Sequence, residues 1–297
     1  MPIGTVTGTD GCPGATNAGS PRVAFQGEAG AFSEEAAQAF FPREPIIAVP
    51  RPEFADVAAE VLAGAADFGV LPAENSIHGS VTGCYDVLAA GELVVVDETV
   101  LRIRLCLLGA PGTDVQAIRR VMSHPVALAQ CRRFLAELAE AEAVAVYDTA
   151  GAAKEVAARA DPTVAAVASR AASVHYGLAI LAADIEDRPD NQTRFYLVAP
   201  ASGQNLNATT SRGTRKALLM IEAAHRPGSL VAVLTPFARH GVNLTHIESR
   251  PADRAWSYRF FLAVAADEGT ALDRALADAR AEAERVIVLG VYPRRTE

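Results

Sequence analysis

Short apolar runs alternate with alanine-rich stretches of helical period from Arg22 to about Pro200. The runs "RVAFQG", "PIIAVP" and "DFGVLPAEN" are followed by "AFSEEAAQAFF", "FADVAAEVLAGA" and "GSVTGCYDVLAAG". Such alternation is typical of βαβ units, in which helices cover the two faces of a sheet. The sequence therefore predicts an α/β domain over residues 22–200.

A long apolar stretch, Leu93 to Leu108, carries Asp97, Glu98 and Thr99 in its middle. We interpret it as the place where the chain passes from one sheet to another. The later run "TRFYLVAP" is predicted to return the chain to the first lobe. Two lobes with a cleft between them follow from this path.

A second domain is expected, because 297 residues would make a very large single core. Residues 201–215, "ASGQNLNATTSRGTR", are polar and without period, and we interpret them as an interdomain linker. Over residues 216–297 the predicted order is strand, helix, strand, strand, helix, strand, which is the ferredoxin-like βαββαβ pattern. Such a module is expected to expose an edge and a helix-free face for dimerisation or for a small ligand.

Residues 1–21 have neither an apolar core of signal-peptide length nor a basic start, and they are predicted to be a disordered tail. No later run approaches the ~18 apolar residues of a membrane span. The cysteines lie far apart, without CxxC or zinc spacing: Cys12, Cys84, Cys106 and Cys131. A reduced, cytoplasmic protein without a structural metal fits this pattern.

The formal net charge of −8 comes from 27 Lys and Arg against 35 Asp and Glu, with no long basic block. Neither a nucleic acid nor an anionic membrane is therefore expected as a partner. Any anionic ligand must be met by local groups.

Turns that lead from a strand into a helix recur along the first domain. "QGEAGAFSEEAA", residues 26–37, is glycine-rich and directs free backbone N–H groups and a positive helix end toward an anion. "YDTAGAAKEVA" repeats the device, with Thr149 and Ala150 at the helix start. Ser33 is either a ligand contact or a helix cap. We expect up to four such helix starts to converge on one cleft.

"LPAENSIHGSVTGCYDVL" places Glu74, Asn75 and Ser76 at the carboxyl end of a predicted strand, where open α/β proteins bind ligands. The alternative is an ordinary Asn/Ser turn with Ser80 as a helix cap. His78 is interpreted as a solvated loop residue rather than a catalytic base.

"SHPVALAQC" puts Pro125 at the first position of a predicted helix, directly after Ser123 and His124. Gln130 follows about a turn and a half later. His124 either orients a carboxylate or caps the helix.

"PDNQTRFYLV" opens like a polar turn and closes like a strand, with Thr193 and Arg194 side by side. Either these are ordinary strand-edge residues, or substrate is held at this point. The chain has no metalloprotease, nucleophile-elbow, P-loop or dinucleotide-binding motif. A cofactor-free site that uses hydroxyls, amides and helix ends is the chemistry that remains.

The whole set of motifs resembles prephenate dehydratase and the similar arogenate dehydratases, from about Val23 to Arg294. Eight motifs occur in the family's order: "GEAGAFS", "PAENSIHGSV", "SHPVALAQC", "DTAGAA", "AAVASRAASVHYGL", "NQTRF", "RPGSL" and "ESRP". The resemblance implies a two-lobed catalytic domain of the type II periplasmic-binding-protein kind, followed by an ACT domain.

The implied reaction is loss of water and CO2 from prephenate to give phenylpyruvate, without a cofactor. Aromatisation drives it, so a weak donor can assist the departing hydroxide. By resemblance the catalytic residues are Thr193, Asn75 and Gln130. The implied substrate-binding residues are Ser33, Glu74, Ser76, Ser123, His124, Thr149, Ala150, Arg194 and Phe195. Arg194 either contacts substrate or forms a structural ion pair with Asp187 and Asp190.

The resemblance also implies feedback inhibition by phenylalanine, bound between ACT modules of a homodimer or homotetramer that associates through both domains. The implied phenylalanine-binding residues are His225, Pro227, Gly228, Ser229, Leu230, Asn243, Glu248, Ser249 and Arg250. These residues could instead only shape a turn. The short tail leaves no room for a chorismate mutase domain, so a monofunctional enzyme is expected.

Three positions depart from the family pattern: Ala31 with Phe32 in the first turn, Val126 after "SHP", and Leu105 where many members have His. The first departure and "DTAGAA" are shared with arogenate-type members, so arogenate stays open as substrate. Prephenate is preferred because no organelle transit signature is present. A bilobed solute-binding protein without turnover is the alternative from another class.

Overall fold

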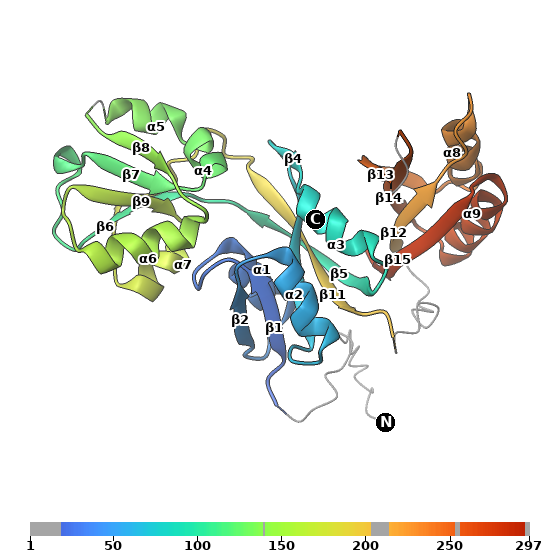
Figure 1. The fold of residues 1–297 in the computed structure, drawn as a ribbon, viewed down its shortest axis with the longest axis horizontal. Helices are drawn as coiled ribbons and strands as arrows, with labels where there is room; N and C mark the ends of the chain where they lie inside the picture. The colour runs from blue at the N-terminus through green and yellow to red at the C-terminus, as the bar shows by residue number, and fades with distance from the viewer. Residues whose placement is uncertain (1–18, 139, 203–213, 253–255, 295–297) are drawn as a thin grey trace, which may run out of the picture.

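The computed structural model describes residues 19–138, 140–202, 214–252 and 256–294, and in it the first domain forms two lobes (Figure 1). The predicted tail therefore lies almost wholly outside the described residues, as does most of the predicted linker. The first lobe is a mixed sheet in the order β2-β1-β3-β11-β5, with β4 paired to β3. Its strands are β1 (Arg22–Gln26), β2 (Ile47–Arg51), β3 (Phe68–Asn75), β4 (Gly79–Ser80), β5 (Leu93–Arg102) and β11 (Gln192–Pro200). Its helices are α1 (Phe32–Phe40), α2 (Phe54–Leu62) and α3 (Thr82–Ala89).

The second lobe is a sheet in the order β10-β6-β9-β7-β8. Its strands are β6 (Cys106–Gly109), β7 (Arg120–Ser123), β8 (Glu142–Ala145), β9 (Val164–Ala168) and β10 (Ala179–Ala182). Its helices are α4 (Pro125–Gln130), α5 (Arg132–Glu137), α6 (Thr149–Arg159) and α7 (Arg170–Tyr176), with the 3-10 turn η1 (Val115–Ala117). Its alanine-rich core strand β9 is buried along its whole length.

The chain crosses between the lobes twice. It leaves the first sheet after β5 and enters the second at β6, within the long apolar stretch that predicted this crossing. It returns through β11, which lies antiparallel between β3 and β5. The predicted return of "TRFYLVAP" to the first lobe is confirmed, and it brings residues some 118 positions apart, Asn75 and Thr193, onto one ladder.

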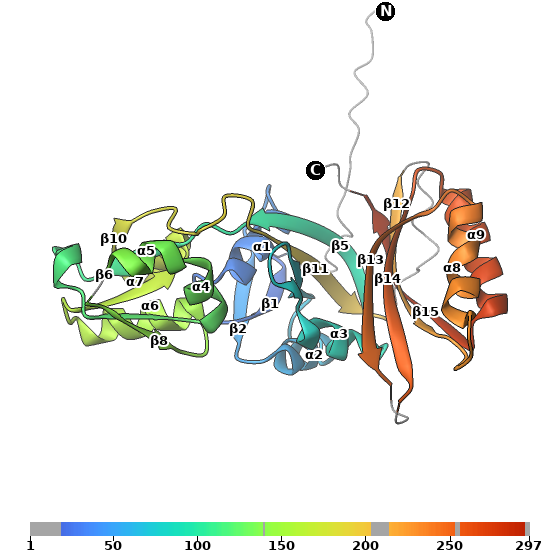
Figure 2. The same cartoon turned by 90° about the horizontal axis from the view of Figure 1, so that it is seen from above.

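The C-terminal module has the predicted βαββαβ order. It comprises β12 (Arg215–Glu222), α8 (Ser229–Arg239), β13 (Asn243–Pro251), β14 (Tyr258–Ala266), α9 (Gly269–Glu282) and β15 (Arg285–Pro293). The sheet order is β13-β14-β12-β15, and every pair is antiparallel. Figure 2 shows both helices on the side of the sheet away from the first domain.

The helix-free face of this sheet is not exposed, which corrects the expectation from the sequence. One apolar cluster joins Leu218, Met220 and Phe261 of the module to Tyr85 and Tyr196 of the first lobe. Burial of apolar area from both domains stabilises this contact. The sequence already carried a sign of it, because "KALLMI" in β12 is apolar at every position after its lysine, as strands covered on both faces are.

The described cysteines Cys84, Cys106 and Cys131 are free thiols with buried side chains. No helix within the described ranges is long and apolar enough to cross a membrane. The same ranges contain no group of three or more His, Cys, Asp or Glu that could hold a metal ion.

Candidate active site

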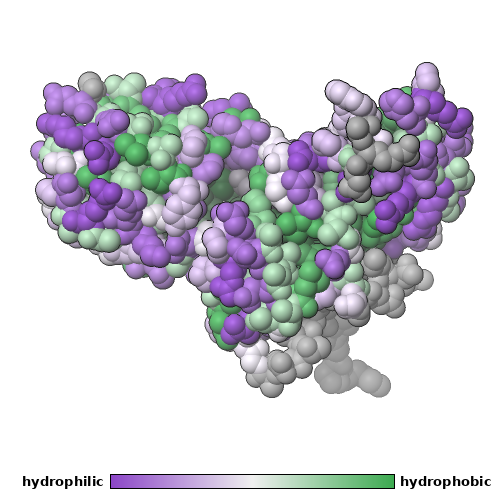
Figure 3. Space-filling view, viewed as in Figure 1, coloured by the Kyte–Doolittle hydropathy of each residue, from purple (hydrophilic) through white to green (hydrophobic). Residues whose placement is uncertain are grey.

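A cavity of about 430 Å³ lies where the two lobes meet, and the surface is hollowed between them (Figure 3). Both lobes contribute to its wall. Of the residues singled out in the sequence, it is lined by Ser33, Asn75, His78, Ser80, His124, Gln130, Thr149, Thr193 and Phe195. The three positions that depart from the family pattern, Ala31 with Phe32, Leu105 and Val126, line it as well.

The starts of four helices meet at this cavity, as predicted. Its wall includes the first residues or caps of α1, α3, α4 and α6. Free N–H groups and the positive dipole end of a helix favour an anion. Among the residues that the structure describes, the wall contains no Lys or Arg, so negative charge in it is met chiefly by backbone and amide donors.

Asp148 is the one acidic residue in the described part of the cavity wall, and its carboxylate already accepts hydrogen bonds. It accepts a hydrogen bond from Gly151 N at 2.9 Å as the cap of α6, and another from Glu28 N at 3.3 Å. Glu28 belongs to the first lobe. Its carboxylate accepts hydrogen bonds from Tyr147 Oη and Lys154 Nζ of the second lobe, at 2.9 and 3.0 Å. These contacts hold the two lobes together beside the cavity.

Thr193 and Asn75 form a direct pair at the cavity floor. They face each other across the β3–β11 ladder, and Asn75 Nδ2 lies 3.0 Å from Thr193 Oγ1. The Asn75 side-chain oxygen Oδ1 accepts from the N–H groups of Ile77 and His78, both at 3.0 Å. This fixes the amide orientation, so Nδ2 is the donor and Thr193 Oγ1 the acceptor. The Thr193 hydroxyl hydrogen is then directed elsewhere.

Asn191 is a site residue that the sequence reasoning missed. It is 0% exposed, and its Oδ1 accepts from Asn75 Nδ2 at 2.9 Å. The burial of Asn191 is set by the tertiary structure, and a buried Asn requires hydrogen-bond partners.

His124 caps α4 through its ring, as the helix-cap interpretation of this residue predicts. Its Nδ1 accepts from Val126 N at 3.3 Å, which requires the unprotonated ring nitrogen. Burial lowers the pKa of His124 below its ordinary value of 6.5, although Asp148 opposes the shift.

The His124→Asn variant tests this cap. The unfolded chain binds the proton more tightly than the folded one, so the stability contributed by neutral His124 is present above pH 6.5 and is lost as the pH falls below it. Asn caps helices without titrating. We expect the wild-type Tm to fall more than that of the variant between about pH 7.5 and 5.5. His175→Asn, at an exposed position, is the control and should behave as wild type; equal Tm losses in wild type and His124→Asn would contradict the prediction.

Five predicted binding residues do not line the cavity: Glu74, Ser76, Ser123, Ala150 and Arg194. Ser123 is 0% exposed and donates to Val167 O at 2.6 Å, inside the second lobe. Ser76 donates to Asp190 O and accepts from Gln192 N, both at 3.0 Å. These two serines shape the strands that carry the site. Ala150 is a fully buried residue of the α6 start.

The alternative that Arg194 pairs with Asp187 and Asp190 is wrong. Arg194 instead donates to Glu74 at 3.2 Å and lies 3.8 Å from Glu98. Asp190 pairs with Arg188, and Asp187 accepts from Arg133 N. Strand alternation explains the difference, because Arg194 points to the face opposite Thr193.

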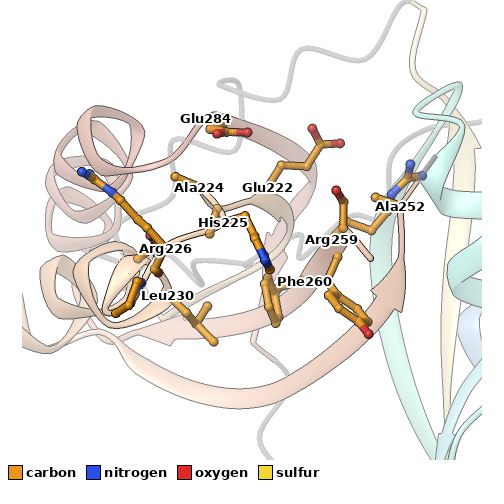
Figure 4. A pocket seen from close by; sticks show the side chains of 14 residues that line it. Glu222, Ala224, His225, Arg226, Leu230, Ala252, Arg259, Phe260 and Glu284 are labelled. Atoms are coloured by element: carbon orange, nitrogen blue, oxygen red, sulfur yellow. Dashed lines mark hydrogen bonds between the residues drawn. The ribbon is translucent and has the colours of Figure 1, made fainter. Parts of the chain in front are cut away.

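A second cavity, of about 520 Å³, lies within the C-terminal module (Figure 4). The turn before α8 and the facing strand β14 form its wall, which includes His225, Pro227, Ser229 and Leu230 from the predicted set. Gly228 lies in the same turn with φ +83°, the left-handed region that favours glycine. Asn243, Glu248, Ser249 and Arg250 do not line the cavity.

The "ESRP" strand β13 contacts the catalytic lobe instead. Glu248 Oε2 accepts from Ser80 Oγ at 2.8 Å, and Arg250 donates to Asp86 at 2.8 Å. On the same strand, His246 Nε2 lies 2.9 Å from the Tyr85 hydroxyl. These alternate residues make one face of β13 a docking surface for α3 and β4.

Fold and site together define a bilobed α/β domain of the periplasmic-binding-protein kind, with an anion-receptive interlobe cavity and an attached ferredoxin-like module. The family model described as prephenate dehydratase matches residues 23–202, and that described as ACT domain matches residues 217–280. The chain belongs to the prephenate dehydratase family and carries a C-terminal ACT domain.

Named relatives agree with this membership. A bifunctional chorismate mutase/prephenate dehydratase from Stutzerimonas stutzeri is 37% identical over 92% of this chain and 73% of its own length. The chloroplastic arogenate dehydratase/prephenate dehydratase 2 of Arabidopsis thaliana is 42% identical over 80% of this chain. The chain spans only 60% of that plant protein.

Solved structures share the fold over most of the chain. A prephenate dehydratase from Arthrobacter aurescens in complex with L-Phe is 31% identical, with a TM-score of 0.82 over 92% of this chain and 90% of that one. GqqA, described as a novel type of quorum quenching acylase, is 34% identical, with a TM-score of 0.83 over 92% of this chain and 98% of its own.

Proposed function

We propose that the chain converts prephenate to phenylpyruvate, with Thr193 donating a proton or hydrogen bond to the departing hydroxyl. One observation carries this assignment: Asn75 donates to Thr193 Oγ1, and the amide is held in that orientation by two backbone N–H groups. Because Asn75 Nδ2 donates to one lone pair of Thr193 Oγ1, the Thr193 hydroxyl keeps its hydrogen for another acceptor, and the residue lines the cavity.

The reaction needs alignment more than acid strength. The ring carboxylate leaves as CO2, the electrons of its C–C bond complete the aromatic ring, and the C4–OH bond breaks with its electron pair on oxygen. A positioned donor stabilises the charge that develops on that oxygen. The hydroxyl group leaves as water once it has gained a proton, and Thr193 is reprotonated from solvent.

The two substrate carboxylates are assigned to the helix starts around the cavity. Small residues at these starts, such as Ala31 and Thr149, allow ligand oxygens to approach backbone N–H groups. Gln130, also in the wall, is assigned as a further amide donor to the substrate. Neutral His124 supplies no fixed charge. This suits a site that must bind a substrate with two carboxylates and then release a product with one.

Assay of the purified protein with prephenate and with arogenate tests the assignment. Phenylpyruvate from prephenate supports it, and phenylalanine from arogenate favours the arogenate dehydratase alternative. Binding of either acid without turnover would identify a solute-binding protein and overturn the proposal. The likeness to GqqA adds a further assay, for acylase activity, which is expected to be negative.

Phenylalanine is proposed as the feedback inhibitor, bound at the ACT cavity. That cavity offers both charge signs that a zwitterionic amino acid requires, with Arg226 and Arg259 beside Glu222 and Glu284, and apolar surface from Leu230 and Phe260. The edge position of β13 suits pairing with a second copy of the chain, so a homodimer or homotetramer is part of the proposal. We also propose that the protein is cytoplasmic.

The Ser229→Ala variant tests the inhibitor site. Ser229 lines the ACT cavity at the start of α8, and its hydroxyl donates to Arg226 O at 2.9 Å. Its loss is expected to raise the half-inhibitory phenylalanine concentration about fivefold while kcat stays unchanged. Thr235→Ala, almost two turns further along α8 and outside the cavity wall, is the control. Unaltered inhibition in Ser229→Ala would reject this site.

A further inference from the structure

Arg194 and Glu74 occupy the ladder position next to that of Thr193 and Asn75. Successive side chains of a strand point to opposite faces, so the catalytic pair faces the cavity and the ion pair faces the ACT module. The Arg194 guanidinium donates to Glu74 at 3.2 Å and approaches Glu98 at 3.8 Å. The same two strands thus carry the site on one face and an ion pair on the other.

The ACT module supplies the other half of this charge cluster. Lys216 Nζ donates to both carboxylate oxygens of Glu98, at 2.6 and 2.8 Å, and the Tyr292 hydroxyl donates to Glu98 at 3.2 Å. Lys216 is 4% exposed and Glu98 is 8% exposed. Separating these two buried ions would leave each charge unpaired away from water, at a high cost in free energy. The pair therefore favours one relative position of the two domains.

His246 makes a second connection to the same ladder. Its Nδ1 lies 3.4 Å from Glu74 Oε1, while the Tyr85 hydroxyl holds Nε2 at 2.9 Å. The hydrogen bond from His246 lowers the pKa of Glu74, although partial burial opposes the shift. Glu74 therefore stays anionic and is held from both sides, by Arg194 and by His246.

We propose that Arg194 and Glu74 are positioning residues for the dehydration, and that the ACT module sets the geometry of Thr193 and Asn75 through them. The interdomain ion cluster consists of Glu74, Glu98, Arg194, Lys216 and His246. A movement of β12 or β13 against the first lobe displaces members of the cluster on β3 and β11, and each displaced residue is bonded through the main chain to a catalytic one. This inference rests on the proposed function and names the path by which phenylalanine acts on it.

The Lys216→Met variant is the first test. It leaves Glu98 without its nearest cation. The β3–β11 ladder is then expected to be held less firmly against the ACT module. We expect kcat to fall on the order of tenfold with KM nearly unchanged, and the half-inhibitory phenylalanine concentration to rise about fivefold or more. Arg215→Met is the matched control, because the neighbouring Arg215 pairs with Asp273 on the opposite face of the same sheet. Its kcat and inhibition should stay within about twofold of wild type.

The double variant Lys216→Met/Glu98→Gln separates positioning from simple stability. Removing both charges is expected to restore the Tm, because no unpaired charge stays buried. Inhibition by phenylalanine should remain weak, since the charged link is absent. If the double variant recovers wild-type inhibition together with its Tm, or if Lys216→Met changes neither kcat nor inhibition, the inference is overturned.

Amide hydrogen exchange provides a readout that needs no turnover. Without any ligand, exchange of β11 at residues 192–195 is expected to accelerate in Lys216→Met and not in Arg215→Met. Unchanged exchange in β11 would reject the inference on its own. A wild-type protein inactive on both prephenate and arogenate would instead reject the proposed function, and the exchange result would still decide whether the ACT module holds this ladder.

Discussion

Thr193→Val is expected to lower kcat on the order of 10²-fold or more, the scale seen when one transition-state donor is removed. This corresponds to about 2.7 kcal/mol of lost transition-state stabilisation. Valine matches threonine closely in shape, so the β11 strand and the cavity floor should stay in place. The side-chain hydroxyl and its bond with Asn75 Nδ2 are what the change removes. Steady-state kinetics of phenylpyruvate formation give the measurement.

Two further variants make the Thr193 test specific. Thr193→Ser keeps the hydroxyl and is expected to retain activity to within about tenfold of wild type. Thr245→Val removes a threonine hydroxyl on β13 that donates to Ala263 O, outside the cavity wall, and should leave kcat unchanged. A Thr193→Val enzyme with wild-type kcat would remove Thr193 from the mechanism.

Gly290→Val is expected to destabilise the protein by roughly 3 kcal/mol or more. A Cβ at Gly290 on β15 would overlap the carbonyl oxygen of Val95 on β5, where the ACT sheet packs on the first lobe. Backbone cannot move aside as a flexible side chain can, so the two domains must separate or distort. Thermal unfolding should show a clear fall in Tm, and inhibition by phenylalanine should weaken because the docking contact is disturbed.

Gly19→Ala is the matched control, since nothing lies within 4 Å of a Cβ at that position. Its Tm should equal that of wild type. A Gly290→Val protein with an unchanged Tm would show that the close contact between β15 and β5 is absent in solution.

Much of the fold was predictable because its signals are local. The periods of two and 3.6 in the apolar pattern give the strands and helices of both domains, and the order of those elements restricts the topology to two α/β lobes and a βαββαβ module. The helix starts at the cavity were predictable for the same reason, since glycine, serine and proline mark them in the chain. His124 and Thr149 lie where those signals put them.

The different roles of Thr193, which lines the cavity, and Arg194, which forms an ion pair on the opposite face, were only partly predictable. Their places on one strand imply opposite faces, but the sequence does not say which element covers each face. One of the two interpretations paired Arg194 with Asp187 and Asp190, which are close in the chain, but its actual partners, Glu74 and Glu98, lie about a hundred residues away. Asn191 was missed because its burial depends on β3 arriving beside it.

The sequence by itself determined the elements, the two domains and the helix starts that meet at the cavity, because backbone propensity, apolar period and helix capping act over a few residues. The tertiary structure alone decided which side chains meet. It set Thr193 against Asn75, turned Glu248 toward Ser80, and placed Lys216 on Glu98 across a domain boundary. Those pairings depend on sheet register and domain docking, which are fixed by burial summed over the whole chain and not by any segment of it.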